Sequence, residues 1–200
     1  MAIKSIDLLK YYDKNYFLNK VEGHKEFKQG KCGWRKLESI KDIDFQNKVI
    51  LDVGCGRGEV LQEAFKKSAN FCIGIDFSKD AIEIAKKYCH KDIMLINDDM
   101  NNLYKYPILF NFDIIFMLDI LEHVNNNEVI IFLNKLRSRI SKDTILIATT
   151  PVNSKKGDYK GMHINQFNIK KINAAFGLIF NKIEIEIRKG HYYIRCKDIK

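Results

Sequence analysis

The sequence predicts an α/β fold, because short apolar runs alternate with helical patterns along most of the chain. Each run is separated from the next by sequence of helix length, so parallel strands joined by right-handed crossovers are expected. The five runs are Val49–Val53, Phe71–Asp76, Asp92–Asn97, Phe112–Leu118 and Ile145–Pro151.

The chain after Pro151 follows a different pattern. A polar loop over residues 152–162 precedes an amphipathic helix that ends near Phe176. Residues 179–187 then alternate like a half-buried strand, and residues 191–196 can return antiparallel after a turn. The full prediction is a seven-stranded, mostly parallel sheet with an antiparallel last strand and helices on both faces.

The composition fits one domain with its own core. Of the 200 residues, 46% are hydrophobic, and no linker-like or repeated stretch divides the chain. The sequence has no signal peptide and no apolar stretch of about eighteen residues, and its five cysteines include no C-x-x-C pair. A reduced, cytoplasmic protein without a membrane span is therefore expected.

The net charge of +9 raises the question of an anionic partner. The lysines are spread along the chain in local pairs such as Lys66-Lys67 and Lys86-Lys87, with no dense arginine block. Most of them are best explained as solvated faces, so nucleic acid is not the expected partner. A phosphorylated or nucleotide-linked small molecule is the remaining hypothesis from charge.

A glycine-rich loop, Gly54–Gly58, ends the first strand, and a helical pattern begins at Glu59. Glycine allows positive φ and lets backbone N–H groups approach a ligand closely. A dinucleotide-binding loop would read G-x-G-x-x-G, whereas this loop reads G-x-G-x-G after the acidic Asp52. The spacing predicts a ligand loop of another kind, with a tight strand-to-helix turn as the structural alternative.

Carboxylates end the next two strands. Asp76 lies about twenty residues beyond the glycine loop, where a nucleotide-binding sheet has the acid that accepts ribose hydroxyls. Asp76 could instead cap the following helix, although the Ser78 hydroxyl suits that role better. Asp98 and Asp99 follow the third strand, and Asp98 is equally well explained as a solvated loop carboxylate.

These motifs resemble those of the class I, Rossmann-like S-adenosylmethionine-dependent methyltransferases. Residues 52–58 resemble the first motif of that family. Phe112-Asp113 followed by Leu121–Val124 resembles the F-D-x-I…L-E-H-V signature of many small-molecule members, and Thr150-Pro151 resembles the end of their fifth strand. The resemblance covers residues 49–151 and is more specific for fold and cofactor than for substrate.

The resemblance implies that S-adenosylmethionine is the cofactor. In the family, the acid of the second strand binds the ribose, and an acid after the third strand binds the adenine amino group while its neighbour packs on the ring. The cofactor-binding residues that this implies are Asp52, Gly54, Gly56, Gly58, Asp76, Phe77, Asp99, Met100 and Leu118.

Residues 1–47 form an aromatic-rich prefix, and residues 48–200 form the methyltransferase domain. In this fold class such a prefix is helical and covers the cofactor cleft. Packing of the aromatic rings onto the sheet is the alternative use of these side chains. The candidates for a substrate wall, or for pairing with the methionine carboxylate, are Tyr11, Tyr12, Tyr16, Trp34 and Arg35.

Two histidines are candidate general bases. The methyl group of a sulfonium is already activated, so alignment of the nucleophile is the main requirement, and a hydroxyl acceptor also gains from a base. His123 follows the fourth strand and His163 follows the loop after the fifth strand. The structural alternatives are a backbone contact at a helix start for His123, and a cap contact for a helix beginning near Asn165 for His163.

Asp119, Glu122 and His123 form a D-x-x-E-H cluster that could hold a divalent ion. Quinone-ring O-methyltransferases and small-RNA 3′-end methyltransferases that resemble this segment use such groups for a metal. This chain departs from them by its Asp119 and by a single later histidine, so a metal is not the favoured prediction.

The predicted function is methyl transfer to a small polar acceptor, with O-methylation of a sugar or nucleotide-linked glycan precursor preferred. A quinone-type O-methyltransferase, an RNA 3′-end methyltransferase and a non-catalytic cofactor-binding module that regulates a partner are the alternatives. The acceptor, the metal dependence and the oligomeric state stay open at this point.

Overall fold

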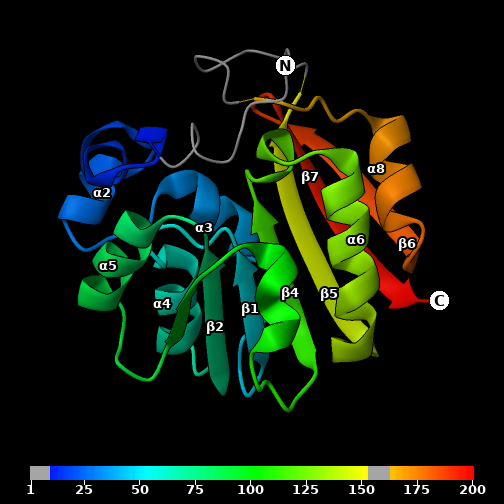
Figure 1. Ribbon diagram of the computed structural model, residues 1–200, viewed down its shortest axis with the longest axis horizontal. Coiled ribbons are helices and arrows are strands. Elements are labelled where there is room, and N and C mark those ends of the chain that lie inside the picture. Colours follow the sequence, from blue (N-terminus) through cyan, green and yellow to red (C-terminus); the bar gives the residue numbers. More distant parts are fainter. Residues whose placement is uncertain (1–9, 153–162) are drawn as a thin grey trace. The chain divides into compact units, whose positions relative to one another are not determined.

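The computed structural model describes residues 10–152 and 163–200 (Figure 1). The contacts within the chain divide it into two compact units, residues 4–103 and residues 104–200, which are described one at a time. We call them the N-terminal unit and the C-terminal unit.

The N-terminal unit contains three parallel strands in the order β3-β2-β1. Helix α4 packs on β1 and β2, and helix α5 packs on β2 and β3, so both sit beside buried apolar strands. The elements are β1 (Val49–Val53), α4 (Glu59–Lys66), β2 (Phe71–Asp76), α5 (Lys79–Tyr88) and β3 (Met94–Asn97).

The described part of the prefix is largely helical. A short π-helix contacts α2, and α3 packs on α4. The buried side chain of Phe17 joins Ala81 and Ile84 of α5 in one apolar cluster. The prefix elements are η1 (Tyr16–Lys20), α2 (His24–Lys28) and α3 (Trp34–Ile40).

The C-terminal unit contains four strands in the order β4-β5-β7-β6. Strand β4 is parallel to β5, whereas β7 is antiparallel to both β5 and β6. Helices α6 and α8 pack on each other, and α8 packs on β6. The elements are η2 (Met100–Lys105, at the junction of the units), β4 (Phe112–Leu118), η3 (Leu121–His123), α6 (Asn126–Leu136), η4 (Arg137–Arg139), β5 (Ile140–Pro151), α8 (Ile169–Phe176), β6 (Phe180–Arg188) and β7 (His191–Ile199).

These strands confirm the predicted fold class, a seven-stranded and mostly parallel sheet with an antiparallel last strand. Strand β5 begins at Ile140, earlier than the apolar pattern predicts. Ile140 pairs with Phe112, and the Thr144 hydroxyl donates to the Phe112 carbonyl at 2.6 Å. Because both contacts are to Phe112, the polar residues between Ile140 and Thr144 are part of the strand. Within residues 10–152 and 163–200, the helices are too short or too polar to cross a bilayer.

Candidate functional site

The glycine loop connects β1 to α4 in the N-terminal unit. Gly54, Gly56 and Gly58 have φ angles of 72°, 53° and 75°, a region that residues with a Cβ rarely adopt. The Gly54 N–H donates to the Ile75 carbonyl at 2.8 Å, which ties the start of the loop to the neighbouring strand. The glycines are therefore required by the backbone conformation of the loop.

Asp76 is buried at the end of β2 and binds the glycine loop directly. Its Oδ2 accepts the Gly56 N–H at 2.8 Å, and its Oδ1 accepts the Ser78 N–H at 2.8 Å. Burial raises the pKa of Asp76 to about 6, although both backbone donors and Lys36 act in the opposite direction. The Ser78 hydroxyl accepts the Ala81 N–H and caps α5, as predicted, so Asp76 is not the cap.

The free acceptor positions of Asp76 could bind a ribose. A carboxylate has about four acceptor positions, and the backbone uses one on each oxygen. One acceptor position on each oxygen is then left for the two hydroxyls of a ribose.

Asp52 is a second buried carboxylate, next to the end of β1 and 3% exposed. Burial raises its pKa to about 7, Lys36 opposes this shift, and the charges of Asp76 and Glu59 add to it. Asp52 and Asp76 are thus two buried carboxyl groups that the fold makes harder to ionise.

The acids after β3 have different surroundings. Asp98 is half-buried, and its Oδ1 accepts the Asp99 N–H at 2.8 Å and the Asn102 side-chain amide at 2.7 Å. Asp99 is exposed, with Oδ1 accepting the Asn101 N–H at 2.8 Å. Asp98 therefore shapes the turn into η2, which Met100 begins, and Asp99 presents the more accessible carboxylate.

The prefix residues that the sequence singled out do not form one group. The Tyr11, Tyr12 and Tyr16 rings pack together, with the Tyr12 and Tyr16 centroids 4.8 Å apart. The Tyr12 ring also meets the 37% exposed Phe77 edge-on at 5.7 Å. Arg35, in α3, is instead ion-paired with Glu22, and Trp34 begins α3 with 42% of its surface exposed.

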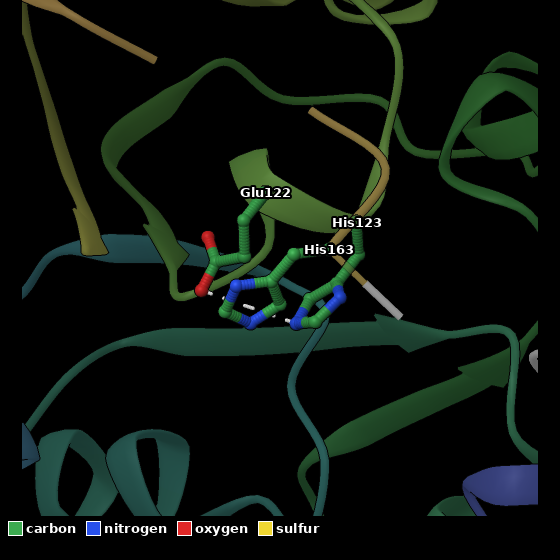
Figure 2. A group of neighbouring side chains, drawn as sticks. All are labelled: Glu122, His123 and His163. Atoms are coloured by element: carbon green, nitrogen blue, oxygen red, sulfur yellow. Dashed lines mark ion pairs between the residues drawn. The ribbon is translucent and has the colours of Figure 1, made fainter. Parts of the chain in front are cut away.

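In the C-terminal unit, Glu122, His123 and His163 form a cluster around η3 (Figure 2). One potential ligand atom from each lies within 4.8 Å of the others. The rings of His123 and His163 meet edge-on with centroids 5.1 Å apart, and Nε2 of His123 is 3.9 Å from Oε1 of Glu122. Figure 2 shows the carboxylate and the two imidazoles turned toward one another.

Glu122 organises this cluster through its backbone and its side chain. Its side chain is buried, and Oε2 accepts the Thr150 hydroxyl at 3.0 Å. Its carbonyl accepts the N–H groups of Ile164 and Asn165 at 2.9 and 3.1 Å, which brings His163 beside η3. Glu122 and His163, which are far apart in sequence, are thus brought together by backbone hydrogen bonds that no local sequence pattern predicts.

The cluster differs from the sequence prediction in one member. The D-x-x-E-H pattern predicts Asp119, Glu122 and His123, but the described residues bring His163 into the cluster and turn Asp119 elsewhere. Asp119 has a φ of 53°, its Oδ1 accepts the Thr149 hydroxyl at 2.8 Å, and its backbone N–H donates to the Thr149 carbonyl. The left-handed backbone directs the Asp119 side chain toward β5, where Nε2 of His191 also lies 4.0 Å from Oδ1.

The structural alternative proposed for His163 is wrong. Helix α8 begins at Ile169 and is capped by the Asn168 side chain, so His163 and Asn165 are not part of its cap. The Asn165 amide donates to the Val124 carbonyl at 3.0 Å instead. His163 is 4% exposed, and its catalytic role, like that of His123, stays a prediction.

Comparison with known proteins agrees with this fold and loop. Residues 50–143 match the protein family described as "Methyltransferase domain". The match covers just under half of the chain and includes the glycine loop. The solved DhpI complex with SAH has a TM-score of 0.71 at 14% identity, covering 95% of this chain and 94% of that chain. A magnesium protoporphyrin IX methyltransferase of Synechocystis PCC 6803 with bound SAM has a TM-score of 0.66 at 14% identity, covering 100% and 99%. Both share the fold.

Curated proteins similar to this chain include ubiquinone biosynthesis O-methyltransferases. The mitochondrial protein of Candida albicans is 33% identical over 126 residues, which are 60% of this chain and 34% of the relative. The protein of Pelagibacter ubique is 30% identical over 109 residues, or 54% of this chain and 44% of the relative. The chain thus matches less than half the length of these two relatives.

The buried carboxyl group of Asp52 predicts an unusual pH dependence of stability. The pKa of Asp52 is about 7 in the folded state and near 3.8 when exposed, so the folded chain binds the proton more tightly. This contribution to stability is complete below about pH 4 and is lost as the pH rises to 7. The unfolding free energy of the wild type should therefore fall between pH 5 and pH 7.5. That of Asp52→Asn should fall by at least about 1 kcal/mol less over the same range.

Urea unfolding at both pH values measures this difference. The exposed Asp42→Asn is the control and should keep the wild-type pH slope. An Asp52→Asn variant with the wild-type slope would contradict the assignment.

Proposed function

We propose that this chain is an S-adenosylmethionine-dependent methyltransferase that methylates a hydroxyl group of a small acceptor. The proposal for the cofactor rests on the methyltransferase domain and on Asp76, whose remaining acceptor positions suit a ribose. The observation that carries the proposal for a hydroxyl is the Glu122, His123 and His163 cluster, which offers proton-accepting groups beside a buried carboxylate.

The cofactor, when bound, supplies a methyl group on a sulfonium centre that is already reactive toward nucleophiles. The protein then has to bind and orient the acceptor and to exclude water. In our proposal Asp76 accepts the ribose hydroxyls, Gly54, Gly56 and Gly58 allow close backbone approach, and Asp99 with Met100 binds the adenine. Asp52, Phe77 and Leu118 complete the proposed cofactor-binding set.

The histidine cluster can remove the proton of the acceptor hydroxyl. His123 is the more accessible imidazole, with 19% of its side chain exposed, whereas His163 is 4% exposed as a residue. We therefore assign the base to His123 and a supporting position to His163. Glu122, fixed by the Thr150 hydroxyl, would stabilise the imidazolium that forms.

The same three side chains also suit a divalent ion. One carboxylate and two imidazoles form a ligand set common for zinc and related metals, and the Thr150 contact orients the carboxylate as outer-shell partners do. An ion there would lower the pKa of a bound hydroxyl. The grouping of His163 with Glu122 and His123 makes this alternative stronger than the sequence pattern does.

Two acceptor classes follow from different observations. The relatives of Candida albicans and Pelagibacter ubique are ubiquinone biosynthesis O-methyltransferases, which favours a phenolic hydroxyl of the quinone type. The net charge of +9 favours the second candidate, a phosphorylated or nucleotide-linked sugar hydroxyl. RNA 3′-end methylation and a purely regulatory module are the remaining candidate functions.

The cofactor proposal predicts that the chain binds S-adenosylmethionine or its demethylated product, SAH, with micromolar or tighter affinity. Asp76→Ala should weaken binding by about 1.5–3 kcal/mol, because hydrogen bonds to a charged group are lost. Titration calorimetry measures both. Binding of NAD without any response to SAM or SAH would refute the proposal.

The base proposal predicts that His123→Asn lowers turnover at least tenfold while the SAH dissociation constant changes less than twofold, the pattern of an interaction made in the transition state. The assay compares methyl transfer to a catechol, to a nucleotide-linked sugar and to an RNA 3′ end. Full activity of His123→Asn on its best acceptor in the presence of a chelator would exclude His123 both as the base and as a metal ligand.

Metal dependence separates the two roles of the cluster. If the cluster holds an ion, a chelator abolishes activity, an added divalent metal restores it, and Glu122→Gln and His163→Asn weaken that metal's binding at least tenfold. Asp119→Asn is the matched control, because Asp119 lies outside the cluster, and it should leave metal affinity unchanged. Activity that is unaffected by the chelator assigns the cluster to base catalysis.

A further inference from the structure

Arg57 is a fully buried arginine within the glycine loop, between Gly56 and Gly58, with 1% of its surface exposed. Arginine is almost never buried without partners, so its contacts indicate what the position is for. Its Nε and one terminal nitrogen donate to Oε2 of Glu59 at 3.0 and 2.8 Å. Glu59, the first residue of α4, is itself fully buried.

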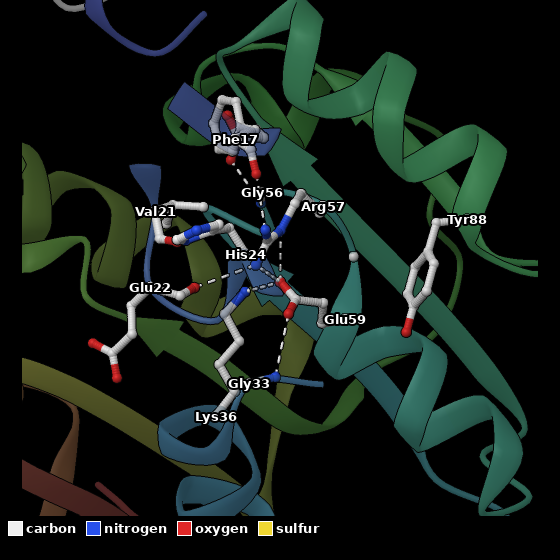
Figure 3. A network of polar contacts seen from close by, with 12 residues as sticks. Phe17, Val21, Glu22, His24, Gly33, Lys36, Gly56, Arg57, Glu59 and Tyr88 are labelled. Atoms are coloured by element: carbon white, nitrogen blue, oxygen red, sulfur yellow. Dashed lines mark hydrogen bonds and ion pairs between the residues drawn. The ribbon is translucent and has the colours of Figure 1, made fainter. Parts of the chain in front are cut away.

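The side chain of Arg57 also binds the prefix (Figure 3). One terminal nitrogen donates to the Phe17 carbonyl at 2.8 Å, and the other donates to the Glu22 carbonyl at 3.3 Å. The guanidinium carbon lies 4.3 Å from the centre of the Phe27 ring, in cation–π geometry. A single side chain of the loop thus binds η1, the turn after it and α2.

Glu59 attaches the next part of the prefix to the same loop. Its Oε2 accepts the Lys36 ammonium at 2.6 Å, and its Oε1 accepts the Gly33 N–H at 3.3 Å. Burial alone would raise the pKa of Glu59, but Lys36 and Arg57 hold it below its ordinary value, so the carboxylate is ionised. Helix α3 is therefore attached through a buried charge.

The two turns of the prefix touch each other at this network. Gly23 has a φ of 75°, and a Cβ added to it would lie 2.9 Å from Cα of Gly33 and 3.7 Å from a terminal nitrogen of Arg57. The two glycines therefore pack closely against each other, Gly23 beside the Arg57 guanidinium and Gly33 beside the Glu59 carboxylate. We call residues 16–40, which contain all of these prefix contacts, the cover segment.

We propose that Arg57 and Glu59 are positioning residues that couple docking of the cover segment to ordering of the glycine loop, so that the two occur as one event. The inference rests on the proposed cofactor site, because it assigns the backbone of the loop to the cofactor and the side chain of Arg57 to the cover segment. If the cover segment leaves, Arg57 loses two carbonyl acceptors and a ring, and Glu59 loses an ammonium and an N–H donor. Charged groups that are buried without partners are unfavourable. Loss of the cover segment therefore raises the free energy of the loop conformation that binds the cofactor.

Limited trypsin digestion of the full chain, with and without SAH, tests this coupling. Lys20, Lys25, Lys28 and Lys31 are cleavage sites inside the cover segment. For the wild type, saturating SAH should slow cleavage at these sites at least fivefold. For Arg57→Gln, cleavage without SAH should be at least tenfold faster at these sites, and the SAH dissociation constant should rise at least tenfold.

Two comparisons separate coupling from general loss of structure. Cleavage at Lys170 and Lys171 in α8 should keep the wild-type rate in Arg57→Gln, because a variant that is merely unstable is cut faster everywhere. Glu63→Gln removes the Lys66–Glu63 pair on the outside of α4, at 2.9 Å, and should change neither cleavage nor SAH affinity.

Phe27→Ala is the second variant, and it decides the matter if Arg57→Gln does not fold. It alters only the cover segment, yet coupling predicts at least a threefold weaker SAH affinity together with faster cleavage at Lys20–Lys31. Wild-type SAH affinity in a variant whose cover segment is cut faster would overturn the coupling. If the wild type itself does not bind SAH, the proposed function fails, and unchanged cleavage of the cover segment in the variants then overturns the coupling separately.

Discussion

The hydrogen bond from the Gly56 N–H to the buried carboxylate of Asp76 is the interaction on which the proposed cofactor site depends. Parallel pairing of β1 with β2 sets Val53 beside Ile75, so the glycine loop and Asp76 leave the sheet at the same edge. A left-handed Gly56 directs its N–H toward Oδ2. The arrangement has an electrostatic cost, since burial raises the pKa of Asp76 to about 6. In our proposal, a ligand that binds the carboxylate is the reason for keeping it there against that cost.

The backbone and the side chains of the glycine loop have different partners. The Gly56 N–H binds Asp76, whereas the side chain of the next residue, Arg57, binds the cover segment and Glu59 (Figure 3). The loop is thus fixed by a carboxylate through its backbone and by a buried ion pair through its side chain. In the C-terminal unit, Glu122 has a similar double use, because its carbonyl holds residues 164 and 165 and its carboxylate stands beside two imidazoles.

Much of this could be predicted from the sequence because it depends on local pattern. Buried parallel strands appear as apolar runs, the glycines mark left-handed backbone, and Asp76 and Ser78 follow a strand at positions with a known use. The burial of Arg57 could not be predicted, since an arginine in a loop is usually exposed and its two carbonyl acceptors lie 40 and 35 residues earlier in the chain. The grouping of His163 with Glu122 depends on backbone hydrogen bonds between residues 122 and 164, and the approach of His191 to Asp119 depends on the register of β7 against β5.

A crystal structure of the chain with bound SAH tests the proposed cofactor site most directly. Both ribose hydroxyls should donate to Asp76 while the Gly56 N–H remains on Oδ2. The sulfur end of the ligand should lie against the glycine loop. A ribose bound by other residues, or a glycine loop that has released Asp76 in order to bind the ligand, would show that Asp76 does not hold the cofactor in this way.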